Sequence, residues 1–236
     1  MRTVAVYSLG RTRYADTWKL QQQVFELRRS GLVGDVLLLN EHEHVYTIGK
    51  GGNDNHLLAS DEELTRGGVD VFHIDRGGDI TYHGPGQLVG YPILDLNTYG
   101  TDIHRYLRNL EEVLIRALQD FGIEGAREEG MTGVWVRGEK IAALGVKVSR
   151  WITMHGFALN VNTDLSKFGR IIPCGIFHKG VTSMECVLGG AVSMEAVARS
   201  VSEAFEEVFE CRTVTMTSEH LRTIVSSHAP AESPTP

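Results

Sequence analysis

Apolar side chains recur every three or four residues in two stretches of the chain, the spacing of an amphipathic helix. One stretch is Asp102 to Phe121, and Gly122 follows it as a residue suited to end a helix. The other is Met194 to Phe209, preceded by Ser193, a favourable N-cap residue. A less regular pattern predicts a third helix over Tyr14 to Ser30.

Short apolar runs between these helices predict β-strands. In one of them Phe157, Leu159 and Val161 alternate with Ala158 and Asn160, which indicates a sheet with one buried face. The predicted strand runs are Val36–Leu39, Val45–Ile48, Val71–Ile74, Leu88–Leu94, Val134–Val136, Ile141–Val148 and Phe157–Val161. Strands and helices are mixed without a linker, so we expect an α/β (α+β) fold with a mixed β-sheet flanked by helices.

We expect this fold to form a single domain over residues 1–222. Residues 223–236 close the chain with three of its six prolines among Ser, Ala and Glu, and we expect them to form a mobile, disordered tail.

Composition narrows the class of protein further. Hydrophobic residues make up 42% of the 236 residues, enough for a packed core. The net charge of −7 disfavours a general nucleic-acid binder. We find neither the ~20 consecutive apolar residues of a membrane span nor a secretory signal at the N-terminus. Three cysteines do not make a disulfide framework. We therefore expect a cytoplasmic monomer that binds no nucleic acid and no membrane.

The segment Arg76 to Leu88, with the sequence RGGDITYHGPGQL, is the densest in chemistry. Paired glycines let a backbone approach a ligand closely, and Gly84-Pro85-Gly86 is a turn that fits a tight hairpin as well as a binding loop. The polar side chains around the turn favour the binding loop; they are Arg76, Asp79, Tyr82, His83 and Gln87. No GxxxxGK[ST] motif occurs, so a phosphate-binding loop is disfavoured.

The histidines do not predict a metal site. His42 and His44 lie two positions apart, but the sequence has no second cluster with zinc-ligand spacing and no CxxC motif. We therefore expect His42, His44, His56 and His73 to be surface or hydrogen-bonding residues.

Cys174 lies in the sequence Ile-Ile-Pro-Cys-Gly, where the proline fixes the approach and the glycine removes bulk beyond the sulfur. Cationic residues nearby in sequence favour a reactive thiolate; they are Lys167, Arg170, His178 and Lys179. A buried, unreactive cysteine in a loop is equally consistent with the sequence alone. Cys186 and Cys211 are interpreted as buried or inert thiols.

Four separated segments together resemble the lipoyl(octanoyl) transferase family. They are Arg76–Leu96, Glu139–Val148, His155–Val161 and Ile171–Ile176, and EHEHVYTIGK before them and VTSM after them also fit. The resemblance runs from about Asp35 to Met184. Asp79 stands where the family commonly has Gln, and Ile172 stands where it often has Asn, which affects loop details only.

This resemblance implies a fold similar to the catalytic domain of biotin and lipoate ligases. It implies transfer of an octanoyl (or lipoyl) group from acyl carrier protein to a specific lysine of lipoyl domains, the first step of protein lipoylation. The implied acceptors are the lipoyl domains of 2-oxoacid dehydrogenases and the glycine cleavage H protein. Because the donor is a thioester and the product an amide, neither ATP nor a cofactor is needed.

By position, the resemblance implies an acyl-thioester on Cys174 and a neighbouring Lys140 that lowers the pKa of the thiol. The implied substrate-binding residues are Arg76, Gly77, Gly78, Asp79, Ile80, Thr81, Tyr82, His83, Ala143, Leu144, Gly145, Gly156, Phe157 and Ala158. Gly145, Gly156 and Ala158 are small and leave room for an acyl chain. No metal ligand is implied.

Several alternatives remain open. Taken alone, Lys140 fits a solvated lysine at a strand end, and Tyr82 and His83 fit residues that hold their loop as well as residues that position substrate. An ATP-dependent lipoate or biotin ligase shares the fold but needs no nucleophilic cysteine. A non-catalytic acyl-binding module needs neither Cys174 nor Lys140. A basic face that attracts the acidic carrier, or else scattered solubilising charges, would be formed by Lys147, Arg150, Lys167, Arg170 and Lys179.

Overall fold

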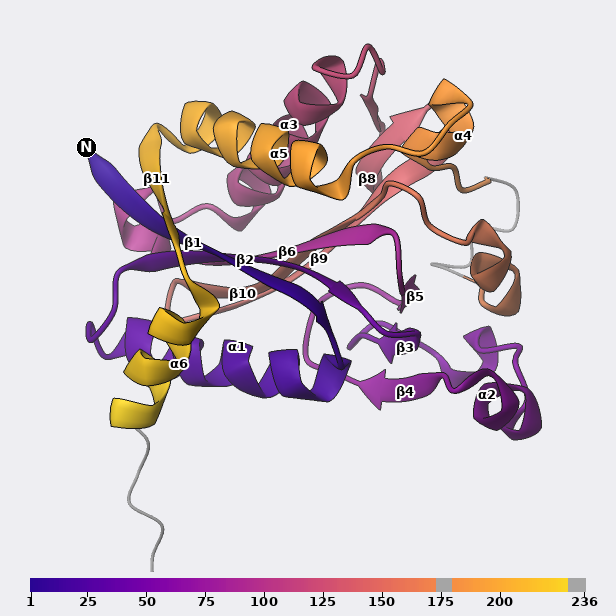
Figure 1. Cartoon of the computed structure of the whole chain (residues 1–236), viewed down its shortest axis with the longest axis horizontal. Coiled ribbons are helices and arrows are strands. Elements are labelled where there is room, and N and C mark those ends of the chain that lie inside the picture. The colour runs from indigo at the N-terminus through magenta and orange to yellow at the C-terminus, as the bar shows by residue number, and fades with distance from the viewer. Residues whose placement is uncertain (173–179, 229–236) are drawn as a thin grey trace, which may run out of the picture.

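A large mixed β-sheet with helices on both faces forms the centre of the molecule (Figure 1). The computed structural model describes residues 1–172 and 180–228. Within these ranges the strand order is β11-β1-β2-β6-β10-β9-β8-β7. The strands are β1 (Arg2–Thr12), β2 (Asp35–His42), β6 (Gln87–Ile93), β7 (Ala126–Glu128), β8 (Met131–Val136), β9 (Glu139–Ser149), β10 (Ile152–Asn160) and β11 (Cys211–Met216). Strand β1 pairs in parallel with β2 and β11, whereas β6, β10 and β9 pair antiparallel, so the predicted mixed sheet is confirmed.

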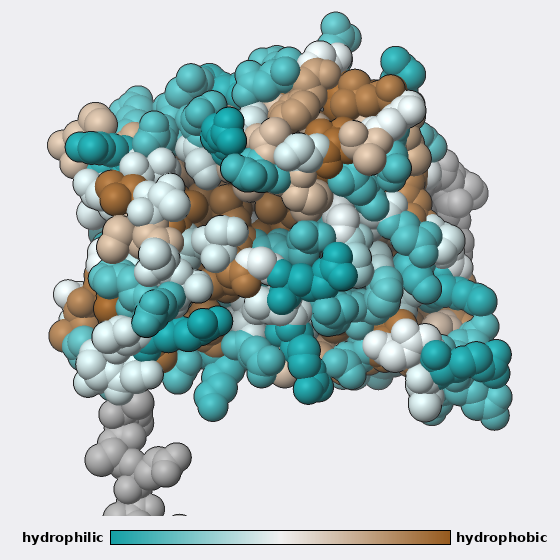
Figure 2. All heavy atoms as spheres, viewed as in Figure 1, coloured by the Kyte–Doolittle hydropathy of each residue, from teal (hydrophilic) through white to brown (hydrophobic). Residues whose placement is uncertain are grey.

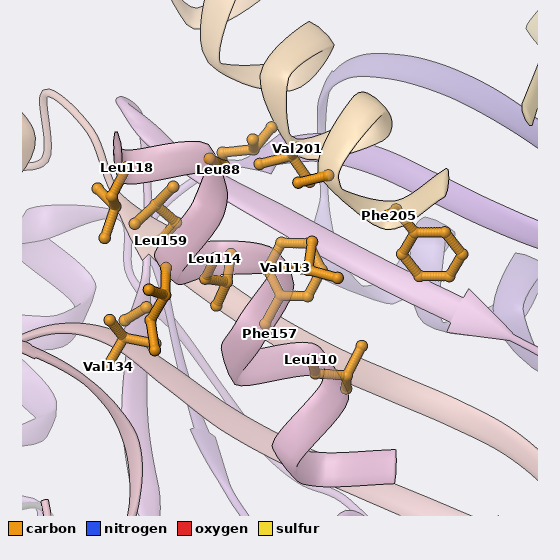
Figure 3. Packing of buried hydrophobic residues seen from close by; sticks show 14 of the residues in the cluster. Leu88, Leu110, Val113, Leu114, Leu118, Val134, Phe157, Leu159, Val201 and Phe205 are labelled. Carbon is orange, nitrogen blue, oxygen red and sulfur yellow. The ribbon is translucent and has the colours of Figure 1, made fainter. Parts of the chain in front are cut away.

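Helices α3 (Ile103–Gln119) and α5 (Met194–Phe209) cover one face of this sheet, and α1 (Tyr14–Arg29) and α6 (Ser218–Ser227) cover the other (Figure 1). We call these the α3 face and the α1 face. Figure 3 shows Phe157 and Leu159 of β10 packed with Leu114 of α3 and Val201 of α5. Ala158, between them in sequence, belongs to the core on the α1 face. The predicted alternation along this strand is therefore confirmed, but the expectation of one buried face is wrong, because helices cover both faces and every residue of β10 is buried.

A second sheet, β4-β3-β5, lies beside the large one. It contains β3 (Val45–Ile48), β4 (Asp70–His73) and β5 (Ile80–His83). The turn Gly84-Pro85-Gly86 leads from β5 to β6, which belong to different sheets, so it is not the turn of a hairpin. Helix α2 (Asp61–Gly67) follows β3, and Figure 2 shows hydrophilic side chains in its region. Apolar side chains reach the surface near α4 (Met184–Leu188), where Leu188 is exposed.

The predicted helices agree with α1, α3 and α5 to within two residues at either end. Ser193 caps α5 as predicted, because its side chain accepts a hydrogen bond from Ala196 N. Every predicted strand run overlaps one of β2, β3, β4, β6, β8, β9 or β10. Short 3-10 helices occupy Asp54–His56, Leu96–Thr98 and Leu165–Arg170.

The predicted start of the tail at residue 223 is too early. Helix α6 continues to Ser227 because Leu221 and Val225 are buried in the core of the α1 face. Residues 229–236 lie outside the described residues. Within the described ranges, none of the helices combines the length and apolar character that crossing a bilayer requires.

Candidate active site

A cavity of about 590 Å³ lies where the loop before β5 crosses β9 and β10. This volume is within the range typical of small-molecule sites. It brings together most of the residues predicted to bind substrate; they are Arg76, Gly77, Gly78, Asp79, Ile80, Thr81, His83, Ala143, Leu144, Gly145, Gly156, Phe157 and Ala158, and Lys140 joins them. Tyr82 does not line it, because its side chain is buried in the small sheet and its hydroxyl lies 2.7 Å from His44 Nδ1.

Small residues let the loop lie directly on the sheet. Gly145 and Gly156 face each other across β9 and β10, as do Ala143 and Ala158. A Cβ atom at Gly145 would lie 2.9 Å from the carbonyl oxygen of Gly77. The Gly77 N–H in turn donates to the carbonyl of Val146 at 2.9 Å. The loop therefore covers the small side chains of the two strands.

Two charged residues of the loop also brace it. The Arg76 guanidinium is buried and donates to the carbonyl and hydroxyl oxygens of Thr47 at 2.7 and 3.0 Å. One carboxylate oxygen of Asp79 accepts from Ile80 N, and the other lies 2.5 Å from His56 Nδ1. Both residues also line the cavity, so they hold the conformation of the loop and form part of the cavity surface.

Asp75 connects the loop to both strands, a connection that the sequence did not reveal. Its carboxylate lies 2.5 Å from Lys147 Nζ on β9 and 2.9 Å from His155 Nε2 on β10. These two hydrogen bonds, the one from His155 above all, hold the pKa of Asp75 well below its usual range. Burial lowers the pKa of His155, which also lines the cavity.

Ion pairs with acidic residues neutralise part of the positive charge of the predicted basic face. Lys147 is paired with Asp75, and Arg170 forms an ion pair with Glu63 at 2.9 Å. Arg150 is exposed, and Lys167 is half-buried. Lys179 lies outside the described residues.

One end of the cavity is lined by rings. Tyr14 stacks on His83 with 6.0 Å between ring centres. His83 Nδ1 lies 2.8 Å from Gln87 Oε1, and its Nε2 lies 3.4 Å from the Thr47 hydroxyl. Burial lowers the pKa of His83 well below its ordinary value. With both nitrogens engaged in the protein, the geometry favours His83 as a residue that holds the loop.

Hydrogen-bond partners are present, as predicted, for His42, His44, His56 and His73. His42 is fully buried rather than at the surface, and its Nε2 lies 2.7 Å from the Tyr91 hydroxyl. His73 is exposed and pairs with Asp54. In the described residues, no group of three or more His, Cys, Asp or Glu side chains is placed to hold a metal ion.

Lys140 is half-buried at the start of β9 and lines the cavity. Its Nζ lies 4.7 Å from the centre of the Trp135 ring, a cation–π arrangement that favours the charged amine. Its backbone N–H donates to the carbonyl of Gly180 at 2.9 Å, and its carbonyl accepts from Thr182 N. These contacts differ from those of a simple solvated lysine.

Cys174 lies outside the described residues, as does His178. The described chain before it ends at Ile172, whose N–H donates to the His56 carbonyl, and resumes at Gly180, which is bonded to Lys140. Of the other cysteines, Cys211 is buried, and burial raises its pKa to about 11, in agreement with an inert thiol.

Cys186 is exposed, so of the two alternatives, a buried or an inert thiol, the first is wrong and the second stays a prediction. Helix α4 directs Met184 into the core, and Cys186 lies two residues further on its outer side.

Comparison with known proteins adds independent information. The family model of the lipoyl protein ligase A/B catalytic domain matches residues 13–206. An octanoyltransferase of Rubrobacter xylanophilus is 55% identical over 201 residues, covering 84% of this chain and 90% of that protein.

Solved structures with low sequence identity share the fold. A bipartite lipoate protein ligase from Thermoplasma acidophilum superposes with a TM-score of 0.72 at 16% identity, covering 96% of this chain and 92% of that chain. A biotin protein ligase from Aquifex aeolicus, in complex with biotin and ATP, gives a TM-score of 0.54 at 13% identity, covering 87% of this chain and 70% of that chain. The predicted likeness to the catalytic domains of lipoate and biotin ligases is therefore confirmed at the level of the fold.

Proposed function

Because the chain belongs to the octanoyltransferase family and is therefore an acyltransferase, we propose that it moves an octanoyl (or lipoyl) group from acyl carrier protein to the acceptor lysine of lipoyl domains. The observation that carries this proposal is that a single cavity is lined by both Lys140 and the small residues of β9 and β10. A reactive group therefore lies beside a space suited to an aliphatic chain.

The proposed reaction has two steps. The Cys174 thiolate attacks the thioester carbonyl, a new C–S bond forms, and the bond to the carrier breaks, so that the carrier leaves as a thiol after taking a proton from the Lys140 ammonium group. The amine of the acceptor lysine then attacks the acyl-enzyme, an amide C–N bond forms, and the Cys174 thiolate is released. The free energy of the thioester drives the transfer, so neither nucleotide nor cofactor enters the balance.

Lys140 has two parts in this proposal. As an ammonium group within ~4–6 Å of the sulfur it favours the thiolate. After losing its proton it accepts one from the attacking lysine. The Trp135 ring beside its Nζ supports the charged form needed for the first part.

Intact-mass measurement tests the proposal. The enzyme is mixed with octanoyl-loaded carrier protein in the absence of nucleotide, and we expect one octanoyl adduct that hydroxylamine releases. The adduct should map to Cys174, disappear in Cys174→Ala, and persist in the control Cys186→Ala. Acylation of a lipoyl domain that requires ATP and free octanoate would instead indicate a ligase, and normal transfer by Cys174→Ala would exclude the thioester mechanism.

Two substitutions separate the parts assigned to Lys140. Lys140→Arg keeps a positive charge but is not expected to accept a proton, so the thioester should form while transfer to the acceptor slows by about 10²–10⁴-fold. Lys140→Ala should slow both steps. Single-turnover measurements of each step with purified carrier and lipoyl domain would show the difference.

A further inference from the structure

The cavity extends on both sides of β9. Strand β8 pairs with β9 only as far as Ala142, and beyond that point the loop carrying Gly77 bonds to Val146. The part on the α1 face, which we call the inner lobe, lies under this loop. Its floor is formed by Ala143, Gly145, Gly156 and Ala158.

The part on the α3 face, which we call the outer lobe, is lined by apolar side chains. Leu144 and Phe157 belong to the core on the α3 face. Their neighbours in sequence line the inner lobe on the α1 face. Leu107 and Ile103 of α3 line the same part, and Ile103 is 40% exposed. The two lobes therefore offer different places for an acyl chain.

The inner lobe crosses three neighbouring strands. Ala143 of β9 lies opposite Ala158 of β10, which lies opposite Val89 of β6. Two strand spacings amount to about 10 Å, the length of an extended eight-carbon chain. The lobe thus has the length of an octanoyl group between the β9 side, which carries Lys140, and the β6 side.

A wall of rings closes the β6 side. Tyr91 follows Val89 on the same face of β6, and both belong to the core of the α1 face. The Tyr91 hydroxyl is bonded to the buried His42 at 2.7 Å, and Tyr14 stacks on His83 at an interplanar angle of 8°. Displacing these rings would leave buried polar atoms without partners, so the wall does not retract easily to admit a longer chain.

We propose that Tyr91, supported by Tyr14, limits the acyl chain to about eight carbons by stopping its methyl end. This inference rests on the proposed function and adds the determinant of its substrate range. The preference should decline on both sides of octanoyl, for different physical reasons. Each methylene removed from octanoyl should cost about fourfold in kcat/KM, because only apolar contact is lost. Two methylenes added should cost about tenfold or more, because they press against the wall.

Rates with carrier protein loaded with hexanoyl, octanoyl, decanoyl or dodecanoyl groups test the inference. Tyr91→Leu should raise the decanoyl to octanoyl ratio of kcat/KM at least tenfold. Tyr91→Phe keeps the ring but removes its hydrogen bond to His42, so it should raise that ratio less than Tyr91→Leu does. Ala158→Val, which narrows the inner lobe, should lower the octanoyl to hexanoyl ratio, and it keeps the inference testable if Tyr91→Leu does not fold.

Leu107→Ala is the matched control, because it enlarges the outer lobe instead; the decanoyl to octanoyl ratio should stay at the wild-type value. A ratio that rises in Leu107→Ala and not in Tyr91→Leu would overturn the inference. Equal use of octanoyl and decanoyl by the wild-type enzyme would also overturn it and leave the proposed function intact. A wild-type enzyme that transfers no acyl group from the carrier would overturn the proposed function, and the inference with it.

Discussion

Gly86 has a backbone conformation in which a side chain is strained, and it lies against the end of β10. Its φ is +77°, and a Cβ atom there would lie 2.3 Å from the carbonyl oxygen of Asn162. Its own carbonyl accepts from the backbone N–H groups of Val161 and Asn162. We expect Gly86→Ala to lower the free energy of unfolding by about 3 kcal/mol, from the left-handed backbone and the forced separation together. Urea denaturation followed by circular dichroism measures this loss.

Gly122→Ala provides the control for this prediction. Gly122 has a similar φ of +70°, but a Cβ atom there would meet no atom of the described residues within 4 Å. Its loss should therefore be about 1 kcal/mol, the cost of the left-handed conformation alone. Equal losses in the two variants would mean that the contact with Asn162 relaxes at little cost.

The sequence indicated which residues form the site but not which residues they contact. Gly77 was expected to let the backbone approach a ligand, and Gly145 was expected to leave room for an acyl chain. In the structure these two glycines approach each other. The bridge made by Asp75 was missed because its partners lie 72 and 80 positions away in the sequence. His42 is buried because β2, an inner strand, carries it, a position that no local pattern around it reveals.

Helix α3 is tied to β8 by a buried carboxylate. Glu111 is fully buried; one of its oxygens accepts from Gly133 N at 3.0 Å, and the other accepts from Arg108 and Arg127 at 2.7 and 3.1 Å. Glu111→Ala removes the partner of a buried N–H and of two guanidinium groups. We expect the free energy of unfolding to fall by about 3 kcal/mol. This is at the lower end of the losses seen when a buried ion pair is broken, because both arginines reach solvent. Urea denaturation provides the measurement.

The neighbouring residue supplies a matched control. Glu112 is partly exposed and pairs with Arg116 and Arg127 at the surface. Glu112→Ala should therefore cost about 1 kcal/mol or less. If the two alanine variants lose the same free energy, the bond to Gly133 does not anchor the helix.

Most elements with an apolar buried face were predicted, but β1, β5 and α6 were missed although each buries apolar side chains. Helix α3 has an apolar stripe that packs on the sheet, whereas α2 has no buried residue and so no helical periodicity to detect. The capping box of α2, in which Ser60 and Glu63 bond to each other's backbone N–H, was the sequence signal that could have located it. Strand β11 was missed because it is an edge strand with several exposed residues and no apolar run.

The arrangement of the whole molecule could not be derived from local patterns. Strand β6 lies between β2 and β10, and β1 lies between β2 and β11, so the sheet joins segments from both ends of the chain. Pairings of this kind depend on contacts between distant residues, which hydrophobic periodicity does not encode. The fold was predicted from the resemblance to a known family. The position of the cavity on both faces of β9 was seen only in the structure.

Three buried histidines make the stability of the whole molecule depend on pH. Burial lowers the pKa of His42 to about 4 and also lowers the pKa values of His83 and His155. An unfolded histidine has a pKa near 6.5. Below that pH the unfolded chain binds protons that the folded chain does not, so stability is complete above about pH 6.5 and falls as the pH drops toward 4. The depressed pKa of Asp75 acts in the same direction, but only below about pH 4.

Urea denaturation at pH 7.5, 6.0 and 5.0 should show this decline, with about 1.4 kcal/mol lost per pH unit for each histidine that stays neutral. His42→Gln retains a group able to bond the Tyr91 hydroxyl but does not titrate, so its stability should fall less steeply with decreasing pH than that of the wild type. Parallel slopes for the wild type and His42→Gln would show that His42 is protonated in the folded state without loss of stability.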